Sequence, residues 1–287
     1  MTLITATALR DLLTTEAPVR VLDVRWTLAH PDGQDAFAAG HIPGAQYVDL
    51  DSRLSDHSRT GLGRHPLPTG SALQESLRSL GVSDGDTVVV YDDAQAAGSS
   101  RAWWTLTAAG VSDVRVLDGG WAAWQADGGE SETGTGRTPT PGDVTVTRDD
   151  LYDGARRVLT EEQAAHTGGL GVLLDARAPE RYRGETEPID PVAGHIPGAA
   201  NLPSTAVLDE EGRFLPADQL REVFTGVGVA EGDGDPVSGA YCGSGVSAAV
   251  LVAAADSVGI NLALFPGSWS QWSQDLVHRA ASHTGLD

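Results

Sequence analysis

The sequence predicts an α/β fold with two tandem domains, each a parallel sheet flanked by helices on both faces. Three observations support this prediction. Short segments that are apolar on both faces alternate with helical patterns, the same motifs occur twice in the chain, and a segment rich in Gly, Thr and Pro separates the two copies. A chain of 287 residues has room for two such domains.

In the first copy, predicted helices alternate with predicted buried strands. Residues at the carboxyl ends of parallel strands are candidates for a functional site, because chemistry collects at that edge of such sheets. We expect helices at Ala6–Leu13, Ser71–Leu80 and Ser99–Ala109, and strands at Val19–Val24, Thr87–Tyr91 and Val114–Leu117.

Four motifs of the first half recur about 150 residues later, an interval that indicates duplicated domains rather than a solenoid. Arg20–Arg25 corresponds to Val172–Arg177, Gly40–Ala45 to Gly194–Ala199, Val88–Asp92 to Ser238–Cys242, and Gly119–Trp124 to Gly267–Trp272.

We predict a first domain over 1–127, an interdomain linker over 128–143 and a second domain over 144–287. The linker lacks apolar periodicity, which is typical of a connecting segment. It contains Gly134-Thr135-Gly136, which weakly resembles a phosphate-binding loop. Because no strand precedes that motif, we exclude a nucleotide site there.

The chain has a single cysteine, Cys242, between a predicted strand and the predicted helix Ala248–Ala255. Gly243 and Gly245 let backbone N–H groups converge, and the helix N-terminus adds positive potential. Both features favour a thiolate nucleophile; the alternative is an inert core thiol. Asp92 stands at the corresponding position of the first copy, so we expect that domain to be catalytically inactive.

The chain carries a net charge of −21 and has a pI of about 4.5. This charge argues against nucleic acids and anionic membranes as partners. The N-terminus lacks the pattern of a signal peptide, and no apolar run approaches membrane-spanning length. A lone cysteine excludes an intramolecular disulfide and suits a reducing compartment. We therefore expect a cytoplasmic protein.

The paired Asp-x-Arg strand ends, the paired Gly-His-Ile-Pro-Gly-Ala motifs and Cys242-Gly-Ser-Gly-Val-Ser247 together resemble the two-domain rhodanese family of sulfurtransferases. The resemblance implies two tandem rhodanese-like domains and no cofactor. It also implies that Cys242 takes a sulfane sulfur from thiosulfate or 3-mercaptopyruvate and passes it, as a persulfide, to cyanide or a thiol. A thioredoxin-like reductant is a further expected partner.

Cys242–Val246 is similar to the loop of the 3-mercaptopyruvate branch, in which a serine, a histidine and an aspartate accompany the cysteine. The resemblance assigns these roles to Ser244, His65 and Asp51. A Ser–His–Asp relay could protonate the enolate of pyruvate that leaves. The alternatives are a turn-forming hydroxyl for Ser244, a solvated loop histidine for His65 and a helix cap for Asp51.

Arg181 resembles the donor-binding arginine that both branches share, since a guanidinium can bind a carboxylate with two hydrogen bonds. The alternative role of Arg181 is a surface salt bridge with a neighbouring glutamate. The second arginine of the 3-mercaptopyruvate branch is absent from Thr186–Asp190, and Arg183 is a candidate substitute. We also assign Gly243, Gly245, Val246 and Ser247 to the binding loop, and Trp26 either to the cleft or to the core.

The repeated histidines, His41 and His195, stand alone without ligands at metal spacing, so we expect them to fix loops through buried hydrogen bonds. We expect the Asp-x-Arg motifs to form structural charge pairs, and the tryptophans at Trp121, Trp124, Trp269 and Trp272 to lie in the core.

Two other function classes compete with sulfur transfer by an enzyme. A cysteine phosphatase shares the strand–loop–helix plan but needs Cys-x5-Arg, and the position of that arginine is Ala248. A module that carries a persulfide to a protein partner is the second alternative. Sulfurtransferase activity agrees best with the intact cysteine loop.

Overall fold

The computed structural model describes residues 1–166, 171–230 and 237–274. The chain divides into two compact units. Unit 1 comprises 1–56, 67–156 and 208–214, and unit 2 comprises 57–66, 157–207 and 215–287. Residues 57–66, which precede most of unit 1 in the sequence, therefore belong to the unit that contains Cys242.

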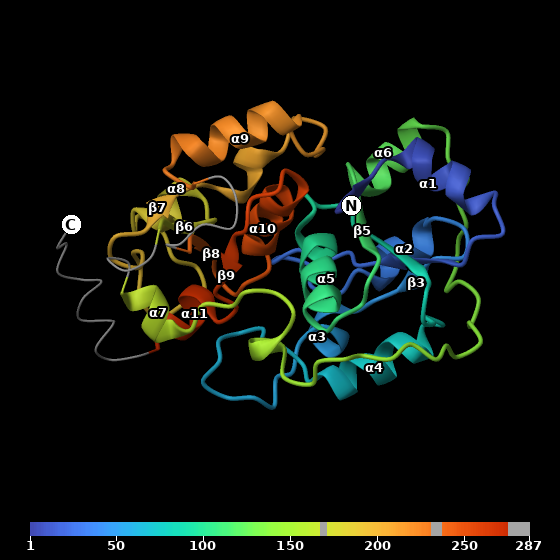
Figure 1. Cartoon of the computed structure of the whole chain (residues 1–287), viewed down its shortest axis with the longest axis horizontal. Helices are drawn as coiled ribbons and strands as arrows, with labels where there is room; N and C mark the ends of the chain where they lie inside the picture. Colours follow the sequence, from blue (N-terminus) through green and yellow to red (C-terminus); the bar gives the residue numbers. More distant parts are fainter. Residues whose placement is uncertain (167–170, 231–236, 275–287) are drawn as a thin grey trace. The chain divides into compact units, whose positions relative to one another are not determined.

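Unit 1 contains a parallel sheet in the order β1-β5-β4-β2-β3. Helix α5 packs on β4 and β5 (Figure 1). The strands are β1 (Leu3–Ile4), β2 (Val19–Asp23), β3 (Gln46–Tyr47), β4 (Thr87–Tyr91) and β5 (Val114–Leu117), and the helices are α1 (Ala6–Leu13), α2 (Gln34–Ala39), α3 (Leu50–Arg53), α4 (Gly70–Ser79), α5 (Ala97–Ala108), α6 (Gly120–Ala126) and the 3-10 helix η1 (Leu151–Asp153).

Unit 2 repeats this plan with the parallel order β7-β6-β8-β9. A parallel bridge between Val158 and Leu264 occupies the place that β1 has beside β5 in unit 1. The strands are β6 (Leu173–Asp175), β7 (Ala200–Asn201), β8 (Gly239–Tyr241) and β9 (Ala263–Leu264), and the helices are α7 (Glu161–Ala165), α8 (Pro179–Tyr182), η3 (Ser204–Val207), α9 (Ala217–Gly226), α10 (Ala248–Ser257) and α11 (Ser268–Trp272).

The core of each unit is built from the same repeated features. Helix α10 packs on β8, β9 and α9 (Figure 1), and its residues 248–255 are all buried. Such a helix has no polar face, because it is covered on all sides. Trp124, Trp269 and Trp272 are buried, as predicted, and Trp121 packs partly buried against the core of unit 1.

Most predicted elements of unit 1 form with the predicted bounds or within two residues of them. The segment predicted as a linker, 128–143, is hydrogen-bonded along unit 1: Gly134 donates to Ala38, and Gly142 donates to Arg78. The backbone N–H of His41 donates to the carbonyl of Glu132, and the N–H of Glu132 donates to the carbonyl of His41. The domain boundaries at 127 and 144 stay a prediction.

Candidate functional site

The loop from β8 to α10 places Cys242 directly after Tyr241 at the carboxyl end of a central strand. Gly245 adopts a φ of 78°, in the left-handed region that favours glycine. A side chain at this position would also collide with the carbonyl oxygen of Pro266. The chain therefore needs glycine at position 245 to turn tightly around the sulfur.

The loop provides backbone N–H donors for the sulfur of Cys242. Gly245 donates its N–H to Sγ over 3.2 Å. Within the described ranges, the N–H groups of Gly243, Ser244 and Val246 donate to no protein acceptor. Cys242 itself is 3% exposed. The loop thus keeps N–H donors available beside a nearly buried thiol, and such a cluster can bind an anion.

Ser268, which the sequence analysis did not single out, fixes the backbone of Cys242. Its hydroxyl accepts from the N–H of Cys242 over 3.1 Å and donates to the carbonyl of Phe265 over 2.8 Å. Ser268 has a φ of 53°, unusual for a residue with a side chain, and Gly120 has a φ of 55° in the same motif of unit 1. The replacement of that glycine by serine was the available sequence signal.

Ser244 and His65 form a direct hydrogen bond. The hydroxyl of Ser244 lies 2.8 Å from Nδ1 of His65, and both side chains are buried, with 4% exposure each. This excludes a solvated histidine at position 65 and gives the Ser244 hydroxyl a partner outside its own turn. A buried hydroxyl–imidazole pair can move a proton between its two members.

Asp51 belongs to unit 1, in the first turn of α3. It is not the cap of that helix, because the carboxylate of Asp49 accepts from the N–H of Ser52 over 2.8 Å. The part of Asp51 in a relay stays a prediction. Trp26 is buried in unit 1 with 7% exposure, and its assignment to a cleft also stays a prediction.

Arg181 lies beside the cysteine loop and is also ion-paired. A methyl group placed on Gly243 would lie 3.5 Å from Nη1 of Arg181. Its Nη2 lies 2.7 Å from Glu187 Oε1 and 3.6 Å from Asp190 Oδ2. The pair with Glu187 is no surface salt bridge, since Arg181 is 15% and Glu187 4% exposed. The ion pair therefore holds the guanidinium near the loop.

Arg64 is a second guanidinium beside the loop, and the sequence analysis missed it. The same methyl group on Gly243 would lie 3.4 Å from Nη2 of Arg64. Nη1 of Arg64 lies 2.8 Å from Asp190 Oδ1. Its position next to His65 was the only available signal. Arg183, the candidate substitute, is instead more than half exposed and pairs with Glu185.

The Asp-x-Arg motifs form the expected charge pairs. In unit 2, the guanidinium of Arg177 binds both carboxylate oxygens of Asp175, at 2.6 to 3.1 Å. Arg177 also lies 4.7 Å from the ring centre of Trp269. In unit 1, Arg25 binds Asp23 over 3.1 Å. These pairs are buried and hold the strand ends.

The repeated histidines fix loops in both units, as predicted. Nδ1 of His41 lies 2.9 Å from the carbonyl of Phe37, and Nδ1 of His195 lies 2.9 Å from that of Tyr182. Each imidazole stacks on the ring of the same residue, with centroids 3.8 and 4.0 Å apart. Within the described ranges, no group of His, Cys, Asp and Glu side chains could hold a metal ion.

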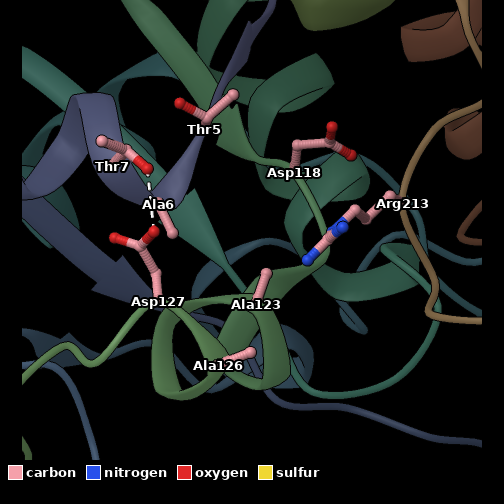
Figure 2. Close-up of a pocket in the computed structure, with 8 residues that line it drawn as sticks. All are labelled: Thr5, Ala6, Thr7, Asp118, Ala123, Ala126, Asp127 and Arg213. Carbon is pink, nitrogen blue, oxygen red and sulfur yellow. Dashed lines mark hydrogen bonds between the residues drawn. The ribbon is translucent and has the colours of Figure 1, made fainter.

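Unit 1 contains a pocket of about 310 Å³ (Figure 2). Its polar groups are engaged: Thr7 donates to Asp127 over 2.8 Å, and Asp118 accepts from the N–H of Phe214. The lining residues include no Cys, His or Ser. They are Thr5, Ala6, Thr7, Asp118, Ala123, Ala126, Asp127 and Arg213.

Comparisons with known proteins agree with this geometry. The model of the rhodanese-like domain matches residues 5–127 and 159–275. The chain belongs to the rhodanese family. The two tandem parallel-sheet domains are thereby confirmed. Among the described residues, no helix is long and apolar enough to cross a membrane.

Relatives and solved structures place the chain among sulfurtransferases. It is 53% identical over 95% of its length to the putative thiosulfate sulfurtransferase SseB of Mycobacterium tuberculosis, covering 94% of that protein. It is 43% identical to a probable 3-mercaptopyruvate sulfurtransferase of Pseudomonas aeruginosa, over 91% of both chains. The structure of SseA from Escherichia coli superposes with a TM-score of 0.79 at 31% identity, over 94% of this chain and all of that one. The prediction of a sulfurtransferase enzyme is confirmed.

Proposed function

We propose that the protein moves a sulfane sulfur from a small anionic donor through a persulfide on Cys242 to a thiophilic acceptor. The observation that carries the proposal is the single cysteine at a strand end, with one N–H on its sulfur and further N–H groups of the loop left open. A persulfide anion needs such donors, because they stabilise its charge without offering an acidic proton.

With 3-mercaptopyruvate, the thiolate of Cys242 attacks the donor sulfur. The S–S bond forms as the C–S bond breaks, and the electron pair of the C–S bond goes to the donor carbon, leaving the enolate of pyruvate. The proton of the donor thiol ends on that carbon, so the products are the Cys242 persulfide anion and pyruvate. Cyanide then takes the outer sulfur as thiocyanate, and the thiolate returns.

The pair of Ser244 and His65 supports 3-mercaptopyruvate as a donor. The step above needs a proton to move from sulfur to carbon. The hydroxyl of Ser244, which is hydrogen-bonded to the imidazole of His65, can carry that proton. Thiosulfate needs no such transfer, because sulfite leaves as an anion. Relatives bear both donor names, and we propose that the chain accepts both, with 3-mercaptopyruvate as the donor that depends on Ser244.

The test is cyanolysis with thiosulfate and with 3-mercaptopyruvate, side by side, together with the intact mass of the protein after incubation with donor alone. We expect thiocyanate from both donors and a mass increase of one sulfur atom that cyanide removes. If neither donor adds sulfur to Cys242, the proposal is wrong.

A persulfide carrier for a protein partner is the remaining alternative. It would show the added sulfur but little turnover with small acceptors. A cysteine phosphatase is disfavoured because Ala248, the position of its arginine, is a buried residue of α10. The acceptor, a thioredoxin-like reductant and a cytoplasmic location stay predictions.

A further inference from the structure

Two guanidinium groups, those of Arg64 and Arg181, lie beside the cysteine loop. The segment around Arg181 supplies one of them. The second arginine expected within 186–190 is absent, and Asp190 stands in that segment. In the structure, Asp190 accepts from Nη1 of Arg64 over 2.8 Å. The segment 186–190 therefore has no arginine of its own but binds Arg64, which comes from a distant part of the sequence.

The two guanidinium groups flank the residue that follows the nucleophile. A methyl group on Gly243 would lie 3.4 Å from Nη2 of Arg64 and 3.5 Å from Nη1 of Arg181. Each arginine also has a buried Nε without an acceptor in the part of the chain that the structure describes. Both cations thus have hydrogen-bonding capacity left.

Arg64 is held in this place by more than one contact. Its backbone N–H donates to the hydroxyl of Ser270 over 2.9 Å, while its guanidinium is bound by Asp190, which is only 4% exposed. Arg64 keeps 26% exposure. A guanidinium that is held by a buried carboxylate, on a side chain that is one quarter exposed, is suited to bind an anion that arrives from solvent.

We propose that Arg64 is the second donor-binding cation of this site, with Asp190 as its positioning residue and built-in counter-ion. This inference rests on the proposed function and names its substrate class: donors with a single carboxylate next to the transferable sulfur. Arg64 and Arg181 together bind that carboxylate, so the cation missing from 186–190 is supplied by residue 64.

The charges around the loop explain the preference for one negative charge. Three guanidinium groups, of Arg64, Arg177 and Arg181, face three carboxylates, of Asp175, Glu187 and Asp190. The cluster is neutral before the donor binds. Attraction by the guanidinium groups and repulsion by the carboxylates both scale with the charge of the donor, so a neutral cluster gives the second charge of thiosulfate no net attraction. The desolvation of that second charge adds a cost, which favours a carboxylate monoanion.

The test uses alkylation of the single cysteine, which needs no sulfur transfer. Native protein is treated with iodoacetate, a carboxylate, and with neutral iodoacetamide, and the ratio of the two rate constants is measured. We expect Arg64→Gln to lower this ratio about tenfold, the loss of one charge-assisted hydrogen bond. Arg64→Lys should recover part of it. The matched control is Arg221→Gln, an exposed arginine of α9.

Asp190→Asn separates the proposal from a purely structural role of the ion pair. The amide oxygen can still accept from Arg64, but one negative charge is gone, so the ratio should rise about threefold or more. The ratio of thiosulfate to 3-mercaptopyruvate kcat/KM should rise with it. A structural role would instead move both Arg64→Gln and Asp190→Asn in the same direction.

Donor kinetics complete the test. Arg64→Gln should raise the KM for 3-mercaptopyruvate about tenfold and change kcat less, as expected when binding is lost equally in ground and transition states. An alkylation ratio unchanged from the Arg221→Gln control overturns the role of Arg64. If the wild type transfers no sulfur but its alkylation ratio still depends on Arg64, the proposed function is wrong and the role of Arg64 in anion binding stands. Failure of both reagents to alkylate Cys242 overturns both.

Discussion

The loops that follow β4 and β8 show how one backbone plan serves two purposes. Both follow a buried tyrosine whose hydroxyl accepts from the N–H of an isoleucine, Ile42 in unit 1 and Ile196 in unit 2. Asp92 begins the first loop and Cys242 the second. In each, the carbonyl of that first residue accepts from the N–H of a repeated tryptophan.

The two loops differ in what occupies their N–H groups. The carboxylate of Asp92 accepts from the N–H groups of Ala94 and Ser99, over 3.0 and 2.7 Å. The sulfur of Cys242 accepts from one N–H, over 3.2 Å, and leaves others open. In unit 1, a carboxyl group that is a fixed part of the protein therefore occupies the N–H donors of the loop. In unit 2, the open N–H groups can stabilise a negative charge that is present only during sulfur transfer.

Transferring residues of the first loop into the second tests this comparison. The largest effect is expected for Cys242→Asp, which removes the nucleophile and fills the loop with a carboxylate. Cyanolysis with either donor should fall by at least about 10³-fold, as for the loss of a covalent nucleophile. Circular dichroism should show a folded protein. Residual turnover near that of the wild type would mean that Cys242 does not carry the sulfur.

The next effect concerns the position two residues further on, which is Ala94 in the first loop and Ser244 in the second. Ser244→Ala removes the hydroxyl that contacts His65. We expect kcat/KM for 3-mercaptopyruvate to fall about 10²-fold, within the range of general acid–base catalysis. Thiosulfate turnover is the internal control and should fall much less. Equal losses for both donors would exclude the proton relay.

The third position is Gln95 in the first loop and Gly245 in the second, with φ values of 56° and 78°. Gly245→Gln should destabilise the protein by about 2–4 kcal/mol, from the left-handed backbone and the collision with Pro266. The reciprocal Gln95→Gly should change the free energy of unfolding by less than about 1 kcal/mol. Urea denaturation of both variants measures the difference. If both variants lose a similar free energy of unfolding, the two loops do not differ in how strictly they require glycine at this position.

The smallest effect concerns pH. Burial raises the pKa of Asp92 above its ordinary 3.8, despite the opposing N–H donors. The stability that the protonated carboxyl group contributes is fully present below pH 3.8. It is lost as the pH rises through the pKa of Asp92 in the folded protein. The wild type should therefore lose stability relative to Asp92→Asn as the pH rises above 3.8, as followed by thermal denaturation. A constant difference would contradict a raised pKa.

Local chemistry in the sequence determined much of the fold and the centre of the site. Apolar segments next to turn residues marked β4, β5 and α1, because burial on both faces and helix capping leave local patterns. The repeat revealed the duplication, and Gly243 and Gly245 marked the loop around Cys242. Each of these signals lies within a few residues of the feature that it predicts.

The tertiary structure alone decided which cations and hydroxyls lie beside that loop. Arg64 and His65 reach Asp190 and Ser244 across separations of 126 and 179 residues. Ser268 reaches Cys242 across 26 residues. Such contacts depend on packing between segments and leave no periodic trace in the sequence, because an arginine before a histidine is compatible with many surroundings. The physical reason is that local propensity acts over one turn or one strand, whereas the charge balance of the site is set by long-range folding.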